Sequence, residues 1–101
     1  MILKCNAVLL AVLFPLAAGC SGALAADAPP GASSCSGCHP VSGSVDTPVK
    51  RLVGAKAADI VGAVQEFRSG KRPATVMDRI AKGFTDDEIK AIADWYAAQK
   101  D

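Results

Sequence analysis

The stretch Cys35-Ser36-Gly37-Cys38-His39 decides how this sequence folds and what it holds. It has the form C-x-x-C-H, the attachment sequence of c-type haem. The spacing has a mechanical reason, because residues three and four apart share one face of a helical turn. Cys35 and Cys38 can therefore bond the two vinyl groups of one porphyrin, and His39 can reach the iron as its proximal axial ligand. The motif predicts one haem c, covalently attached.

Three other uses of the cysteine pair fit the sequence less well. A thioredoxin-like redox C-x-x-C needs a preceding strand in a βαβ setting, whereas Pro-Pro-Gly-Ala-Ser-Ser, 29–34, comes before this pair. A structural disulfide between Cys35 and Cys38 gives the histidine no role. A zinc site needs four ligands, and only three candidates cluster here. Haem attachment is the interpretation that uses all three side chains.

We expect the sixth iron ligand to be Met77. The chain has a single histidine, and Met77 is its one methionine besides the initiator, so ligation by two histidines is excluded. A thioether opposite the histidine is the common arrangement in cytochromes c, and it raises the reduction potential. Core filling is the other frequent role of a methionine. Lys71 and Lys82 are weaker alternatives, because an exposed ammonium must first lose its proton.

Length and composition limit the remaining choices. The chain has 101 residues and a formal net charge of +1. It is therefore one domain at most, and no strong field attracts nucleic acid, so we expect no nucleic-acid partner. A domain under ~80 residues rarely builds a sufficient core alone. A covalently held porphyrin would therefore become part of the fold.

Residues 1–25 are expected to be a cleaved signal peptide. Lys4 supplies the positive charge, and the apolar run 7–18 is shorter than the ~20 residues that a bilayer span requires. Residues 23–25, Ala-Leu-Ala, form a cleavage site. A buried N-terminal helix is the alternative. Cleavage would leave one domain, 26–101, in the periplasm.

A second processing signal competes with this one. Residues 16–20, Leu-Ala-Ala-Gly-Cys, resemble the lipobox of bacterial lipoproteins, with the leucine one position too far upstream. Lipidation at Cys20 would make the same domain a membrane-anchored lipoprotein that faces the periplasm. A membrane partner is therefore expected only if Cys20 is lipidated, and both routes export the protein.

The rest of the chain is predicted to be helical. An apolar stripe at helical spacing runs through 57–68, and a glycine and a proline follow it. A short helix is expected at 76–82, with Thr75 as its N-cap. A third begins at the capping box Thr85-Asp86-Asp87-Glu88. No segment shows strand alternation, so the expected fold class is all-α, with about three helices wrapped around one covalently attached haem.

Two of these helices have a defined apolar face. The stripes comprise Ile60, Val61, Val64 and Phe67 in the first helix and Ile89, Ile92, Ala93 and Tyr96 in the third. Trp95 lies beside the second stripe. It could cover a haem edge or simply pack in the core.

Together these features resemble a class I c-type cytochrome over 32–100. Segment 67–84, which contains Thr-Val-Met, is similar to the cytochrome subunits of flavocytochrome c sulfide dehydrogenases and to related small single-haem cytochromes. The resemblance implies a small class I cytochrome c fold. It also implies that Met77 is the distal ligand. The sulfide dehydrogenase subunits usually carry two such domains, whereas this chain has one.

A second part of the resemblance is Pro48-Val49-Lys50-Arg51-Leu52-Val53-Gly54, which is similar to a Pro-x-x-x-Leu-x-Gly segment of that family. It implies that the Pro48 carbonyl accepts a hydrogen bond from His39, which would fix the tautomer of a ligand histidine. It also implies that Pro48 and Leu52 lie against the haem. The chain departs from the family at Pro40, where a glycine usually follows the ligand histidine.

The expected function is that of a periplasmic mono-haem c-type cytochrome, which carries single electrons between redox partners and is not itself an enzyme. The alternative is the electron-accepting cytochrome subunit of a flavin-dependent sulfide, or other reduced-sulfur, dehydrogenase, with a flavoprotein as its partner. Catalysis at an open haem is a third interpretation, and it requires that Met77 does not bind the iron.

Charge divides the chain into two stretches. Residues 49–84 carry eight basic and three acidic side chains, whereas 85–101 carry two basic and five acidic ones. The basic stretch flanks Met77. We expect this side to meet an acidic partner transiently, the alternative being an ordinary solvated surface.

Overall fold

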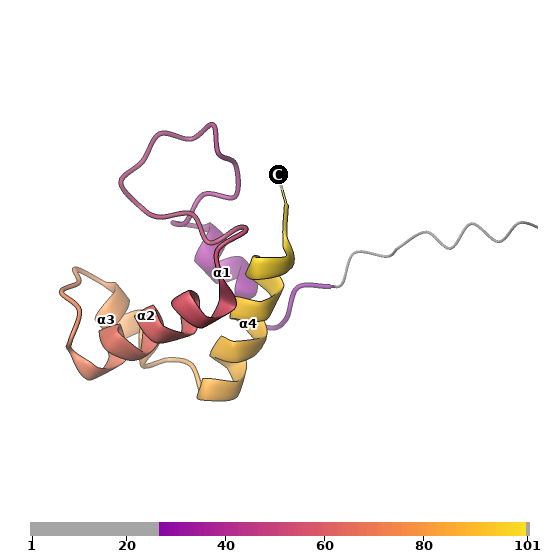
Figure 1. Ribbon diagram of the computed structural model, residues 1–101. Helices are drawn as coiled ribbons and strands as arrows, with labels where there is room; N and C mark the ends of the chain where they lie inside the picture. The colour runs from indigo at the N-terminus through magenta and orange to yellow at the C-terminus, as the bar shows by residue number, and fades with distance from the viewer. Residues whose placement is uncertain (1–26, 101) are drawn as a thin grey trace, which may run out of the picture.

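The chain forms four helices and no strand within residues 27–100, the part that this computed structural model describes. They are α1 (Ala32–Ser36), α2 (Ala57–Ser69), α3 (Met77–Ala81) and α4 (Asp86–Ala98) (Figure 1). The expected signal peptide and Cys20 lie outside the described residues. None of the helices described is long and apolar enough to cross a membrane. The predicted all-α class is confirmed.

Helix α1 is the addition to the three helices expected from the sequence. A tight turn leads into it, in which the Ala32 N–H donates to the Pro29 carbonyl at 3.1 Å. Gly31 has φ 87° and ψ −14°, the values of the third residue of a type II turn, where glycine is favoured. Five residues are too few to show a helical period, so the pattern of the sequence does not reveal α1.

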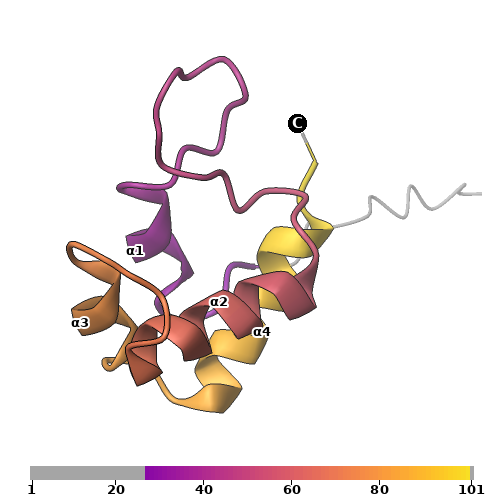
Figure 2. The same ribbon diagram turned by 60° about the vertical axis from the view of Figure 1, so that its left-hand side comes forward.

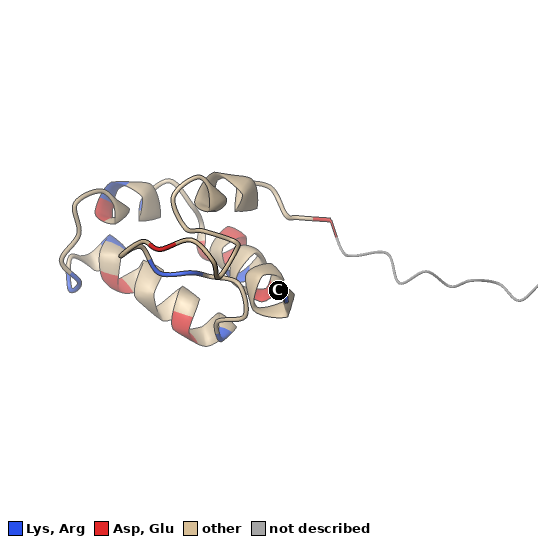
Figure 3. Ribbon diagram, turned by 90° about the horizontal axis from the view of Figure 1, so that it is seen from above, with Lys and Arg blue, Asp and Glu red and all other residues tan. Residues whose placement is uncertain are grey.

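Helix α2 packs against both α3 and α4 and holds the core together. The two apolar stripes face the core as expected. Ile60 and Val64 in α2 and Ile89, Ile92, Ala93 and Tyr96 in α4 are buried, and Val61 and Phe67 in α2 are partly buried against the core. One cluster lies between α1, α2 and α4, and a second joins α2 to α3 and the start of α4. Figures 2 and 3 place α1 and α3 on the same side of the α2–α4 pair.

The helix ends follow local chemistry at α4 but not at α3. At α4 the predicted capping box is present: the Glu88 N–H donates to Thr85 Oγ1 at 3.2 Å, and the Thr85 N–H donates to Glu88 Oε2 at 2.7 Å. The predicted Thr75 cap of α3 is wrong. The N-cap residue is Val76, with no side-chain cap. The helix begins at Met77, one residue later than expected, so Thr75 precedes the capping position.

Tyr96 ties the first helix to the last. Its buried hydroxyl donates to the Ala32 carbonyl at 2.5 Å, and burial raises the pKa of this phenol. The Tyr96 carbonyl accepts from the Gly54 N–H at 3.0 Å. A single residue of α4 therefore positions both α1 and the loop that enters α2.

Gly31→Ala should destabilise the folded protein by about 2–4 kcal/mol, since a positive φ and overpacking each cost up to ~3 kcal/mol. A Cβ at Gly31 would lie 2.7 Å from Phe84 Cε1, at φ +87°. Gly62→Ala is the matched control, because a Cβ there meets nothing within 4 Å, and it should stabilise α2 by about 0.5–1 kcal/mol. Thermal unfolding of the holoprotein measures both. Equal stability of the two variants would contradict the requirement for glycine at position 31.

Candidate functional site

The structure brings Cys35, Cys38 and His39 together on one helical turn. The Cys38 and His39 N–H groups both donate to the Cys35 carbonyl, at 3.2 and 2.9 Å. No disulfide joins the two cysteines. Cys35 is partly buried against the core, and burial raises the pKa of its thiol. Cys38 is exposed. The backbone therefore forms the helical turn that the spacing predicted, and the attachment of haem to it stays a prediction.

The His39 ring is oriented by a backbone carbonyl. Its Nδ1 lies 2.5 Å from the Lys50 carbonyl oxygen. Because a carbonyl can only accept, Nδ1 carries the proton, and Nε2 keeps its lone pair for a metal. Such a hydrogen bond is the usual partner of a ligand histidine, whose orientation and basicity it sets.

The expected partner of His39, the Pro48 carbonyl, is wrong. A local turn, in which the Val49 N–H donates to Thr47 Oγ1 at 3.2 Å, leaves Pro48 on the surface. The carbonyl two residues further on takes its place. The resemblance identified the correct segment but not the correct residue, because the direction of a carbonyl depends on the turn before it.

Met77, the expected distal ligand, is the first residue of α3 and is partly buried. It lines a hollow of about 470 Å³ together with Phe67 and the residues just before α3, which are Pro73, Ala74 and Thr75. Helix α3 begins with Met77, and α1 leads into the turn that contains His39. The two helices lie on the same side of the molecule (Figure 2). Ligation by Met77 stays a prediction.

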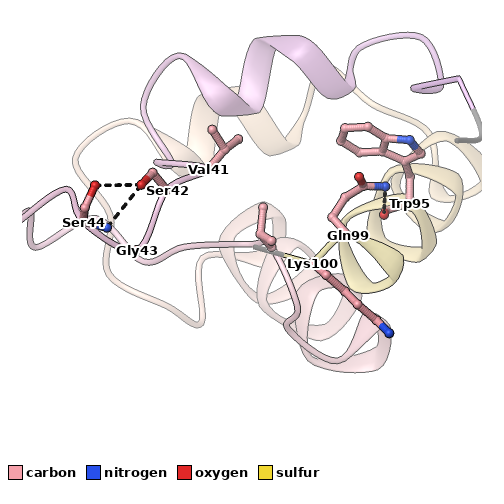
Figure 4. A pocket seen from close by; sticks show the side chains of 8 residues that line it. Val41, Ser42, Gly43, Ser44, Trp95, Gln99 and Lys100 are labelled. Atoms are coloured by element: carbon pink, nitrogen blue, oxygen red, sulfur yellow. Dashed lines mark hydrogen bonds between the residues drawn. The ribbon is translucent and has the colours of Figure 1, made fainter.

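Trp95 and Leu52 both pack against the core cluster between α1, α2 and α4. The Trp95 ring meets that of Tyr96 edge-on, with centroids 4.9 Å apart and planes at 82°. Trp95 also lines a second hollow of about 560 Å³, with Val41 and Gln99 among its other walls (Figure 4). It therefore packs in the core and borders a hollow, so both roles considered for it remain compatible with its position.

A set of exposed aliphatic side chains was not anticipated. Its members are between 37% and 53% exposed and come from the loop after His39 and from around Met77: Val41, Val45, Val49, Val76 and Ile80. Valines in a loop follow no helical or strand period, so the hydrophobic pattern of the sequence does not reveal them. Only the number of apolar residues in the loop indicates such a surface. Exposed apolar side chains, two cysteines not joined in a disulfide and an imidazole held through Nδ1 together fit an apolar plate with a metal at its centre.

The same donor set does not fit a bare metal ion. Over residues 27–100 there is no group of three or more His, Cys, Asp or Glu side chains that could hold one. Structural zinc needs four such ligands in a tetrahedral arrangement. The zinc alternative therefore has no support in the geometry, whereas a porphyrin would bring four nitrogen ligands of its own.

Basic residues flank Met77 in the sequence. Figure 3 marks Lys and Arg positions on the ribbon of α3 and of the loop before it, at the end of the molecule away from the C-terminus. Lys71, Arg79 and Lys82 are exposed. Arg72 is paired with Glu66 at 2.7 Å and lies over the Phe67 ring, 5.5 Å from its centroid.

Comparison with known proteins identifies two relatives. The chain is 38% identical over 63 residues to the cytochrome subunit of sulfide dehydrogenase from Chlorobaculum tepidum. That alignment covers 62% of this chain and 57%, rather more than half, of the relative. The chain is also 33% identical over 96 residues to cytochrome c-553 from Nitratidesulfovibrio vulgaris, covering 87% of this chain and 91% of that protein. No family model matches.

Proposed function

We propose, from the premise that this chain belongs to the small class I c-type cytochromes, that it carries single electrons between redox proteins in the periplasm. The observation that carries the proposal is the turn of Cys35, Cys38 and His39, with Nδ1 of the imidazole bound to the Lys50 carbonyl. We propose that it holds one haem c.

Each of these residues has a distinct task. Cys35 and Cys38 would hold the haem through two thioether bonds, and His39 would bind its iron through Nε2. When bound, the haem supplies an iron that cycles between the ferric and ferrous states. The Lys50 carbonyl keeps the His39 proton on Nδ1, which orients the ring.

Met77 would also bind the iron, through its thioether sulfur. Its thioether raises the reduction potential. If His39 and Met77 both bound the iron, the protein would leave no coordination position open for a substrate. This arrangement favours electron transfer over catalysis at an open haem, the third interpretation considered from the sequence.

Purified protein, matured in a host that attaches c-type haem, tests the proposal. We expect a reversible redox titration with the slope of one electron, and haem that stays with the protein in acid-acetone. Haem that is extracted by this treatment would contradict the thioether assignment. A titration that requires two electrons would contradict the single-electron role.

A second function is favoured by the relative from Chlorobaculum tepidum, which is a cytochrome subunit of sulfide dehydrogenase. In this alternative the chain is the electron-accepting subunit of a flavin-dependent dehydrogenase that acts on sulfide or another reduced sulfur compound. Purification from the native cell distinguishes the two functions. Co-elution with a flavoprotein, and reduction of the haem on addition of sulfide, would favour the subunit over the free carrier.

The periplasmic location is part of the proposal and rests on the sequence of residues 1–25. N-terminal analysis of the mature protein tests it. A start at Ala26 indicates a soluble periplasmic protein, and a lipidated Cys20 indicates a membrane-anchored one. Retention of Met1 would contradict export by either route.

Electron transfer to an acidic partner should slow with added salt. The exposed cations beside Met77 would steer the encounter, and such steering raises association rates by about ten-fold or more at low ionic strength. Lys82→Glu should lower the second-order rate and weaken its salt dependence. Lys90→Glu, on α4, is the control: Lys90 pairs with Asp94 at 2.8 Å on the surface. A rate that does not change with salt in the unmodified protein would end the steering hypothesis.

A further inference from the structure

Arg68, at the end of α2, makes three contacts with the connection between α3 and α4. Its Nε donates to the Ala81 carbonyl at 3.2 Å, and Nη2 donates to the Phe84 carbonyl at 2.8 Å. Its Nη1 donates to Asp86 Oδ1 at 2.5 Å. Ala81 is the last residue of α3, and the carbonyls of the last helical turn have no partner within the helix. The guanidinium supplies one.

Helix α3 depends on such outside support. It has five residues, far fewer than the ~12–15 that an isolated helix needs to be even marginally stable. Its N-terminus has no side-chain cap, and residues 71–76 before it are all exposed. The position of α3 is therefore set at its C-terminal end.

Two features fix that end. The Ala81 side chain is fully buried in the cluster with Val64 and Ile89. The Ala81 carbonyl is bound by Arg68, whose side chain is 29% exposed. Met77 lies one helical turn before Ala81, about 6 Å along the helix axis at 1.5 Å per residue. Whatever fixes Ala81 therefore also limits the movement of Met77.

We propose that Arg68 is a positioning residue that, by binding the Ala81 and Phe84 carbonyls, holds α3 so that the Met77 thioether stays on the haem iron. This inference rests on the proposed function, because it takes Met77 as the distal ligand. The forked guanidinium is the feature that matters. It donates in several directions at once, which a lysine ammonium on a flexible chain does not reproduce.

The ion pair with Asp86 contributes little to the hold of Arg68 on the α3–α4 connection. The Asp86 side chain is 74% exposed, and ion pairs at such sites contribute little. The two carbonyl bonds are part-buried, so they hold the connection where water competes less. Asp86→Asn, which keeps both carbonyl bonds, should therefore behave almost like the unmodified protein.

Competition by an external ligand measures how firmly Met77 is held. In Arg68→Gln we expect imidazole to bind the ferric haem about ten-fold more tightly, the factor that ~1.4 kcal/mol of lost restraint produces. The red ferric band that marks thioether coordination should also be lost at a lower temperature. Arg68→Lys should lie between Arg68→Gln and the unmodified protein.

Two controls separate positioning from charge. Arg72→Gln removes a cation from the same region, but Arg72 contacts Glu66 and Phe67 rather than α3. It should leave the imidazole affinity within about two-fold of the unmodified value, as should Asp86→Asn. If Arg72→Gln has the same effect as Arg68→Gln, charge rather than position is responsible, and the proposal is overturned.

The outcomes also distinguish the inference from the function on which it rests. If Met77→Ala keeps the red band, Met77 is not the ligand and the proposed iron site fails. If Met77→Ala loses the band while Arg68→Gln keeps both band and imidazole affinity, only the positioning role fails. Should Arg68→Gln not fold, Arg68→Lys decides: an imidazole affinity equal to that of the unmodified protein overturns the proposal.

Discussion

Met77→Ala should lower the reduction potential by on the order of 0.1 V or more, within the ~0.8 V range that axial ligands cover. A soft thioether donor favours the ferrous state, so its loss makes reduction of the iron less favourable. The ferric band of thioether coordination should disappear, and the sixth position should become open to imidazole or carbon monoxide. Redox titration and visible spectroscopy measure both effects.

Val76→Ala is the matched control for this variant. Val76 precedes Met77 and is 47% exposed, but its aliphatic side chain cannot bind iron. It should keep the band and change the potential only slightly. An unchanged spectrum and potential in Met77→Ala would show that Met77 is not a ligand, and catalysis at an open haem would then gain support.

Replacing both Cys35 and Cys38 by serine should abolish stable haem retention. Without thioether bonds the haem is held only by axial coordination and packing, so acid-acetone should extract it fully. The described domain is also short, and a chain under ~80 residues rarely builds a sufficient core alone. We therefore expect a large fall in the yield and melting temperature of folded holoprotein.

The single variants should differ from each other. Cys35 is partly buried against the core and Cys38 is exposed, so a serine hydroxyl at 35 also carries a desolvation cost. Cys35→Ser should be the less stable of the two. Ser36→Ala, between the cysteines and exposed, is the control and should retain the haem. Full haem retention by the double serine variant would contradict covalent attachment through this pair.

Local patterns predicted most of the fold. The stripes of α2 and α4 and the capping box at Thr85 depend on residues only a few positions apart, and the structure has them where the sequence places them. The turn of Cys35, Cys38 and His39 also follows from spacing alone. Features of this kind are set by the period of the backbone, which the sequence displays directly.

Contacts between distant segments were not predictable in the same way. The Lys50 carbonyl binds His39 in place of the expected Pro48 carbonyl because a local turn redirects the chain. Arg68 reaches the α3–α4 connection across 13 to 18 positions in sequence. Neither contact has a periodic signature, and Arg68 looks like any surface cation until α2 and α3 are packed together.

The mass of the intact mature protein tests the central claim most directly. If Cys35 and Cys38 hold one haem, denatured protein should have the mass of the processed chain plus one haem, and a proteolytic fragment containing both cysteines should carry that addition. A mass equal to the chain alone, with both thiols free or joined as a disulfide, would contradict the account.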